Sequence, residues 1–416
     1  MSDCGSSATP SLSPTPPHAL AVAQQLPQDV VALIAHHLTV DDSEHRHDTL
    51  EDRRDDVRSF ARVCKAWRAA GTAAAWREVE LFLGMAFWVG KHLETYPHLF
   101  KHVESMSVSL SYLSIARADD ESQDVVASCP RLSRLELRVD RQAGSYLQAL
   151  QDKTDLTKLF EVVIQTVDMS WQSWHHYATF DRLVSANLVF AFVRACPNVR
   201  RFAYIGHQEI VNETADVPHG RRIKLDELTL DIKDTKLDSE TGRRSSSIRS
   251  RFLLQFDLGR LVVFKAHVNL RDSDNLAALD RMANLETLRL VDDHGLDVDA
   301  LDALGARIVR LVKLRDVDLS AAPEVECPTS PAVLQAVERL FKALPATVER
   351  LSLSVPLPEP LAEALLEGSP GLEHFLSHVY DPLDVRPEAS EMHWRRTVYV
   401  SGDEMEQLDV EDNESL

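Results

Sequence analysis

A six-residue motif, apolar-x-x-apolar-x-apolar, recurs along most of this chain and constrains its fold more than any other feature. Successive copies begin 24 to 40 residues apart, which is the spacing of solenoid repeats. Ten copies lie between residues 103 and 377, and they begin at Val103, Leu132, Leu159, Val199, Leu225, Leu261, Leu285, Leu314, Val348 and Leu372. Apolar residues that alternate in this way are typical of a short strand with one buried face.

The segments that precede the motifs are stronger evidence for a repeat fold than the motifs themselves. Apolar residues make up 44% of the chain, so a match arises by chance in about 1.5% of windows, or roughly six per chain. Several copies follow a helix-like segment and a breaker, as in DVVASCPRL, VFAFVRACPNV and VERLFKALPATV. Proline stops such a helix and turns the chain into the strand. This recurrence predicts an α/β solenoid of the leucine-rich-repeat type, with parallel strands and outer helices. The alternative is an ordinary α/β core in which the matches are coincidental.

The charge balance of the chain limits its partners. The 416 residues hold 45 Lys and Arg against 65 Asp and Glu, which gives a net charge of −20. So acidic a chain repels a phosphate backbone, and we expect no nucleic-acid partner. Complementarity favours a protein target with a basic or neutral surface.

The cysteines and the chain termini indicate an intracellular protein. The 5 cysteines are widely spaced and form no CxxC pair, which argues against a disulfide framework and favours a reducing compartment. The first residues lack the basic start and apolar run of a signal peptide. The longest apolar runs are about half of the ~20 residues that a membrane span needs. We therefore expect no membrane contact, and a cytoplasmic or nuclear location, or both.

Composition also sets the outer boundaries of the folded chain. Residues 1–24 are rich in Ser, Pro and Ala, so we expect a disordered tail there. Residues 401–416 hold seven acids and no base, so we expect 400–416 to be a solvated acidic tail. Between the tails we predict a helical module at 25–82 and the repeat domain at 83–390.

The helical module begins with LPQDVVALIAHHL. This segment places four aliphatic residues on one helical face, at Val30, Val31, Ile34 and Leu38. The densely charged segment from Thr39 to Asp56 predicts a loop. A second helix follows, with an apolar stripe at Val57, Phe60, Cys64 and Trp67. We predict that Gly71 ends this helix and that Thr72 caps a short third helix carrying Trp76.

This module resembles an F-box. The matching features are a Leu-Pro pair, a helix with paired aliphatics, a Val-Cys-x-x-Trp-Arg segment and a downstream tryptophan. They cover about 55 of the 416 residues, and they occur at Leu26-Pro27, Val30-Val31, Ile34, Leu38, Val63-Cys64, Trp67-Arg68 and Trp76. The loop from Thr39 to Asp56 is longer and more charged than the usual turn of the family.

The resemblance implies that the module docks on the Skp-type adaptor of a cullin-RING ubiquitin ligase. By this likeness, direct adaptor contacts come from Leu26, Pro27, Val30, Val31, Ile34 and Leu38. Packing and the rest of the contact surface come from Phe60, Val63, Cys64, Trp67 and Trp76. A unit of about 55 residues cannot bury all of its apolar side chains alone, which agrees with a partner covering some of them.

Several residues could instead carry chemistry, and each has a simpler interpretation. His36, His37, His45 and His47 lie near acids that could help to bind zinc, but a helix end and a charged loop explain them as well. Cys64 has basic neighbours, yet it shares an apolar stripe, which favours a buried thiol over a redox site. WQSWHHY at 171–177 is interpreted as a packing element rather than a recognition loop. Ser246, in a short basic segment, is either a phosphorylation site or part of a loop insertion.

The sequence contains none of the GxGxxG, GxxxxGK[ST], GxSxG or HExxH motifs. We therefore expect no catalytic residue, no cofactor and no metal. The expected function is that of a substrate receptor of a Skp-cullin-F-box type ligase, which binds the adaptor and an unknown protein target. Two alternatives remain: a repeat scaffold without a ligase, and an α/β enzyme with an unrecognised site.

Overall fold

The computed structural model describes fourteen segments of the chain. They are residues 26–37, 59–82, 97–109, 123–139, 144–166, 186–207, 222–233, 250–271, 273–292, 294–321, 330–369, 371–379, 390–395 and 398–399. Among them, no helix is both long and apolar enough to cross a membrane. Several predicted features lie outside the described residues, namely both tails, the Thr39 to Asp56 loop, the WQSWHHY segment and Ser246.

The strands form one continuous sheet in which spatial order follows chain order. Within the described segments it contains thirteen strands, of which β1 to β11 pair in parallel and the last two pair antiparallel. The strands are β1 Glu78–Phe82, β2 Ser105–Ser109, β3 Arg134–Val139, β4 Glu161–Thr166, β5 Arg201–His207, β6 Glu227–Lys233, β7 Val263–Val268, β8 Thr287–Asp292, β9 Asp316–Ala321, β10 Arg350–Leu353, β11 His374–Val379, β12 Ser390–Arg395 and β13 Val398–Tyr399. The prediction of side-by-side parallel strands is confirmed.

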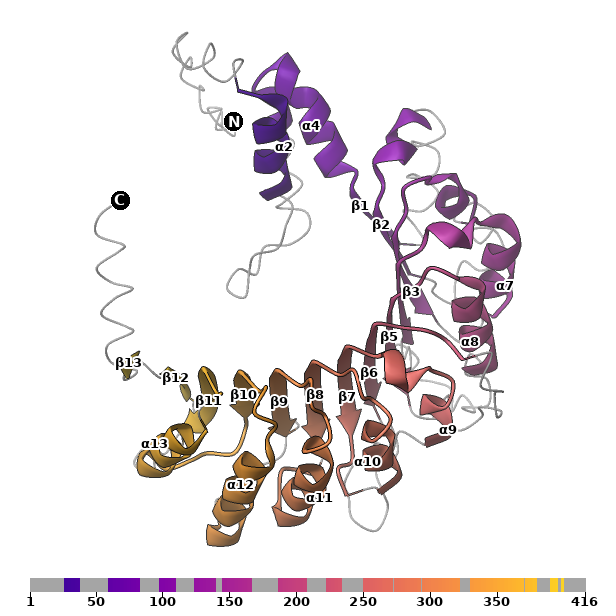
Figure 1. Ribbon diagram of the computed structural model, residues 1–416. Coiled ribbons are helices and arrows are strands. Elements are labelled where there is room, and N and C mark those ends of the chain that lie inside the picture. The colour runs from indigo at the N-terminus through magenta and orange to yellow at the C-terminus, as the bar shows by residue number, and fades with distance from the viewer. Residues whose placement is uncertain are drawn as a thin grey trace, which may run out of the picture.

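Helices cover one face of this sheet and form the outer side of an arc (Figure 1). The α-helices along the repeats are α7 Gly144–Lys153, α8 Ala186–Ala195, α9 Ser250–Leu253, α10 Ser273–Leu279, α11 Val298–Ile308, α12 Pro331–Ala343 and α13 Glu359–Gly368. Among the described residues, 3-10 helices also occur at η1 Pro97–His102, η2 Leu156–Lys158 and η6 Leu258–Arg260. Proline follows helical segments as expected, because Pro130 follows the helical residues 123–128, Pro197 follows α8 and Pro345 follows α12. The predicted outer helices are therefore confirmed.

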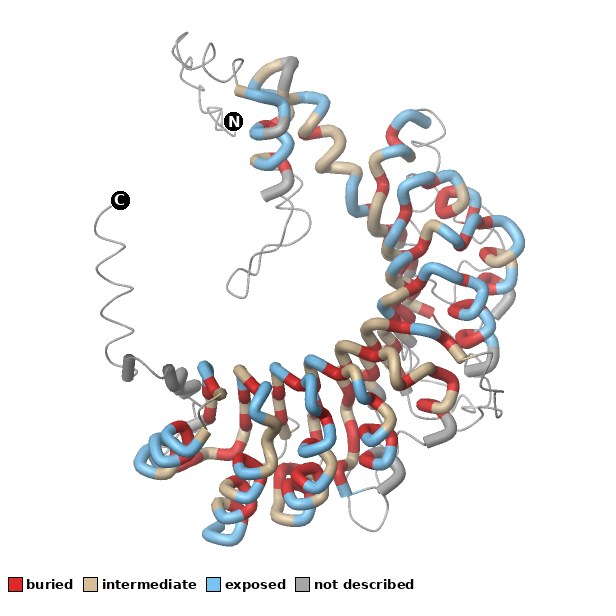
Figure 2. The backbone as a smooth tube through the Cα atoms, in the orientation of Figure 1, coloured by how far each residue is buried: buried red, intermediate tan, exposed pale blue. Residues whose placement is uncertain are grey.

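Each of the ten predicted motifs forms a strand that begins two residues after the motif starts. In β3, for example, Leu135, Leu137 and Val139 are fully buried, and the residues between them are only half-buried. Leu132, the first apolar residue of that motif, is also fully buried. The buried residues lie between the sheet and the helices (Figure 2). The motif therefore predicts the strands correctly because its apolar residues all point into one elongated core.

A ladder of backbone hydrogen bonds joins neighbouring repeats just before each strand. The carbonyl of Ser133 accepts from the N–H groups of Phe160 at 2.8 Å and Glu161 at 3.0 Å. The same pairing recurs from repeat to repeat, and it begins at Arg77, whose carbonyl accepts from Glu104 and Ser105. Equivalent turn residues of successive repeats are therefore direct neighbours.

The solenoid begins earlier than the sequence indicates. The segment from Trp76 to Leu81 is an eleventh copy of the motif, and it leads into β1. Val79 and Leu81 are buried in the core of the solenoid, and the half-buried Trp76 packs against that core. The sheet thus starts inside the segment 25–82 that was predicted to be a helical module.

The N-terminal helices differ from the prediction in one respect. They comprise α2 Gln28–His37, a helical turn at residues 59–62, and α4 Lys65–Ala75. The predicted break at Gly71 and Thr72 is wrong, because α4 continues through both residues. The helix is interrupted earlier, at Cys64, whose backbone is extended. Gly71 is needed for close approach instead, since a Cβ on it would lie 2.6 Å from the Cβ of Ala61.

Candidate functional site

The N-terminal helices have a small core of their own. Val31, Ala35 and Phe60 are buried there, and the ring of Phe60 stacks on Trp67 with centroids 4.5 Å apart and an interplanar angle of 29°. This cluster is separate from the long core of the solenoid. Because this core is so small, the rest of the described chain does not cover the outer faces of these helices.

Aliphatic side chains are exposed on these helices. Val30 and Leu33 on α2 are 37% and 55% exposed, and Val63, just before α4, is 39% exposed. Pro27, at the start of α2, is exposed as well. Val31 and Ala35 point inward, so α2 has apolar residues both toward its partner helix and away from it. An apolar outer face of this kind is suited to contact with another protein.

The residues implied by the F-box resemblance fall into distinct environments. Leu26, Ile34 and Trp67 are half-buried around the small core. Cys64 is half-buried at the start of α4. Val31 and Phe60 are buried, whereas Pro27, Val30 and Val63 are exposed. Leu38 lies outside the described residues. The structure thus brings most of these residues onto α2, α4 and the turn between them, and it places Trp76 on the solenoid.

Leu33 is the residue that the sequence reasoning missed. It is the most exposed of the aliphatic residues on α2, and it lies three positions after Val30. That spacing puts both on the outer face of the helix. The prediction that Val30 shares one helical face with Val31 and Ile34 is therefore wrong, because Val30 lies with Leu33 on the outer face.

The concave face of the sheet carries paired charges. In-register parallel strands place equivalent side chains next to one another, so ion pairs cross from strand to strand. Arg134 Nε lies 3.0 Å from Glu161 Oε1, and Arg201 Nε lies 3.4 Å from Glu227 Oε2. Lys265 Nζ also contacts Glu227, at 2.8 Å. This part of the concave face therefore neutralises much of its own charge, and the overall acidity of the chain says little about what it binds.

Two buried cysteines have no redox character. Cys129 and Cys196 precede the prolines that end two helical segments, and each Sγ donates to a backbone carbonyl at 3.2 Å. Burial raises the pKa of both thiols to about 12. A thiol with so high a pKa carries almost no thiolate at neutral pH, so these two side chains act as small apolar groups.

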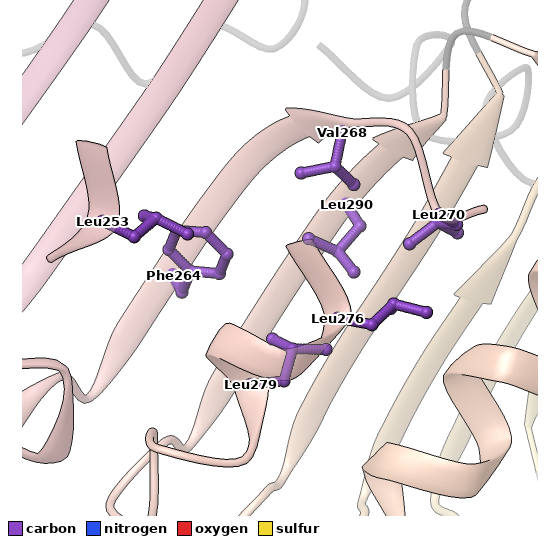
Figure 3. A pocket seen from close by; sticks show the side chains of 7 residues that line it. All are labelled: Leu253, Phe264, Val268, Leu270, Leu276, Leu279 and Leu290. Carbon is purple, nitrogen blue, oxygen red and sulfur yellow. The ribbon is translucent and has the colours of Figure 1, made fainter. Parts of the chain in front are cut away.

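One cavity lies between the sheet and α10, and its seven lining side chains are all apolar (Figure 3). They come from α9, β7, α10, β8 and the turn after β7, and they are Leu253, Phe264, Val268, Leu270, Leu276, Leu279 and Leu290. Its volume of about 10 Å³ is too small for a substrate. Within the described segments, no group of three or more His, Cys, Asp or Glu side chains is arranged to hold a metal ion.

No family model and no curated protein matches this chain. Solved structures similar to part of it include the following two. A TLR13–ssRNA13 complex has a TM-score of 0.31 and 12% identity over 62% of this chain, and the match covers 37% of the TLR13 chain. A sugar phosphate isomerase/epimerase from Parabacteroides distasonis has a TM-score of 0.19 and 9% identity over 64% of this chain and 94% of that chain. At these scores the likeness carries no functional argument, and the assignment of a repeat solenoid rests on the strands and helices described above.

Proposed function

We propose that this protein is a substrate receptor that binds two other proteins. The N-terminal helices would dock on a Skp-type adaptor and, through it, on a cullin-RING ubiquitin ligase. The repeat solenoid would hold a protein target. The observation that carries the proposal is the set of exposed aliphatic residues Val30, Leu33 and Val63 on helices with only a small core.

Covering these residues would contribute favourable energy to docking. Complete burial of an aliphatic side chain stabilises a complex by about 1.5–3 kcal/mol. Val30, Leu33 and Val63 are each more than one-third exposed, so a partner would gain part of that energy at each position. Pro27 adds a rigid apolar group at the start of the same helix.

The proposed mechanism requires no chemistry from this chain. A target held on the solenoid would be close to a ubiquitin carrier that is bound elsewhere in the ligase. Tethering of this kind raises the effective concentration of one reactant at the other, typically to the millimolar range. Ubiquitin transfer itself would be carried out by other subunits, so the proposal places no catalytic residue in this protein.

Adaptor binding can be tested with purified components. Val30→Asp and Leu33→Asp introduce a charge where the proposed interface would exclude water, so each should weaken binding at least about ten-fold. Val312→Asp is the matched control, since Val312 is 64% exposed on the solenoid. All three changes are at the surface and should alter stability by no more than about 0.5 kcal/mol. Equal adaptor affinity for the wild type, Val30→Asp and Leu33→Asp would refute the proposal.

A second candidate function is a repeat scaffold that has no ligase. It is favoured by Trp76, which packs against the core of the solenoid and so is already used by the fold itself. If the wild-type protein does not bind the adaptor in the same assay, the scaffold is the better explanation. Affinity purification from cells with and without proteasome inhibition distinguishes the receptor from the scaffold. Only a ligase receptor should have partner proteins that accumulate when the proteasome is inhibited.

A further inference from the structure

A row of cations follows the edge of the sheet where the parallel strands begin. The turn before each of five successive strands, β3 to β7, contributes one basic residue, and these residues are Arg131, Lys158, Arg200, Lys224 and Arg260. We refer to them as the basic rim. The backbone ladder joins the same turns directly, through Ser133, Phe160, Arg200 and Asp226. Neighbouring strands lie about 4.8 Å apart, so the rim extends over roughly 20 Å.

Among the described residues, part of this charge has no acidic partner. Arg260 forms an ion pair with Asp226 at 3.0 Å, and Lys158 donates to the carbonyl of Cys129 at 2.6 Å. Arg131, Arg200 and Lys224 form no ion pair with any of the described residues. The five turns, at 129–134, 155–161, 196–201, 222–227 and 257–263, hold eight bases and five acids. The rim region is thus positive by three charges on a chain whose net charge is −20.

Two groups that flank the rim lie close to cations of these turns. Before β3, burial and the nearby charges of Lys101, Arg131 and His98 lower the pKa of His102. Beyond β7, burial and the charge of Arg222 lower the pKa of Arg281, although Asp257 opposes this. Burial is the main cause of both shifts, and the neighbouring cations add to it.

An exposed aromatic ring lies within the same edge. Phe160 is 46% exposed, and it follows Lys158 by two residues in the turn before β4. The guanidinium carbon of Arg201 lies 5.6 Å from the centre of this ring. An apolar side chain of a ligand could pack on Phe160 while acidic groups contact the cations on either side.

We propose that the basic rim binds an acidic peptide segment of a partner protein. Six or seven extended residues, at about 3.3 Å each, match the length of the rim. A short acidic segment experiences mainly the charges within about 8 Å, the screening length at physiological salt. A long nucleic acid would also meet the repulsion of the remaining, strongly acidic chain, which is why we favour a peptide. The proposal is independent of adaptor docking on α2.

The test uses the full chain and a fluorescein-labelled peptide of about twelve residues with alternating Glu and Ser, followed by fluorescence anisotropy. We expect binding that weakens strongly between about 50 mM and about 300 mM NaCl. Lys224→Glu should weaken it about five-fold, and the double variant Arg200→Glu with Lys224→Glu about 25-fold. Lys342→Glu is the control, since Lys342 is exposed on α12 and the same change in net charge occurs far from the rim. Circular dichroism checks that each variant remains folded.

Four results would overturn the proposal. One is no binding of the peptide at low salt, and another is an equal loss with Lys342→Glu, which would indicate only a response to total charge. Tighter binding of a single-stranded oligonucleotide, weakened by the same rim variants, would identify nucleic acid as the ligand. If removal of residues 401–416 raised peptide affinity more than about five-fold, the chain's own acidic tail, rather than a partner, would occupy the rim.

Discussion

Replacing Gly71 with alanine should destabilise the N-terminal helices, although alanine is normally the better helix former. Gly71 lies in the interior of α4, where a Cβ would meet the Cβ of Ala61 at 2.6 Å and its Cα at 3.0 Å. Carbon atoms in ordinary contact are about 3.5–4.0 Å apart. The helical turn at 59–62 would therefore have to move away from α4 by about 1 Å.

Two effects of opposite sign determine the result. Alanine in a helix interior is favoured over glycine by about 1 kcal/mol. Overpacking costs about 1–3 kcal/mol, and here the backbone of Ala61 is part of the clash, so a side-chain rotation cannot relieve it. The net change is a loss of about 1 kcal/mol in the stability of the N-terminal helices.

Hydrogen exchange of the amides in α2 and α4 is the suitable measurement, because these helices have a core separate from the solenoid and can open locally. A loss of about 1 kcal/mol should speed their exchange about five-fold. Gly305→Ala is the control. Gly305 is buried in the interior of α11, but the nearest atoms to its Cβ lie 3.8 Å away, so alanine should slow exchange there.

Exchange in α2 and α4 that is slower in Gly71→Ala than in the wild type would refute this reasoning. It would mean that helix propensity outweighs the contact with Ala61, and that the two helical segments are packed less closely than described. A faster rate in Gly305→Ala would show instead that glycine in these helices is required for another reason.

Three further predictions concern the solenoid. Asn284→Ala should cost about 1 kcal/mol in chemical unfolding, because Asn284 Nδ2 donates at 2.6 Å to a carbonyl of the preceding turn. Hydrogen bonds from Arg339 lower the pKa of Asp302 in the folded protein. The ionised carboxylate therefore stabilises the fold at pH values above about 3.9, the pKa of aspartate in the unfolded chain. This stabilisation is lost as the pH falls through the lower pKa that Asp302 has in the folded protein. Asp302→Asn should accordingly lower the free energy of unfolding by less than about 1 kcal/mol at pH 7. In thermal unfolding below about pH 4, the difference in stability from the wild type should become smaller. Cys129 and Cys196, with pKa values near 12, should resist iodoacetamide until the protein unfolds, and rapid native labelling seen by mass spectrometry would contradict their burial.

The repeats could be predicted from sequence because their signal is local. In each repeat the strand, its buried positions and the helix breaker lie within about a dozen residues, as in VFAFVRACPNV before β5. The antiparallel strands β12 and β13 follow no such motif, so the sequence offered nothing by which to predict them. The copy at Trp76 was missed because the same tryptophan also fits the F-box pattern.

The candidate surfaces depend more strongly on tertiary structure. From sequence, Gly71 is interpreted as the end of a helix, since glycine tolerates the left-handed backbone at which helices end. In the structure, glycine is required at this position because Ala61 lies too close for a Cβ. Most leucines described in the repeats are buried, whereas the packing of α2 leaves Leu33 exposed. Exposure results from contacts between distant segments, which the pattern of a single segment does not contain.

The sequence by itself determined the repeating strand, its buried face and the average charge. Only the tertiary structure decided which charges are neighbours. Arg131 and Arg260 are 129 positions apart, yet both lie on one edge because five parallel strands stack in register between their turns. Stacking converts a separation along the chain into about 4.8 Å per strand, and so a chain of net charge −20 acquires a row of five basic residues along one edge.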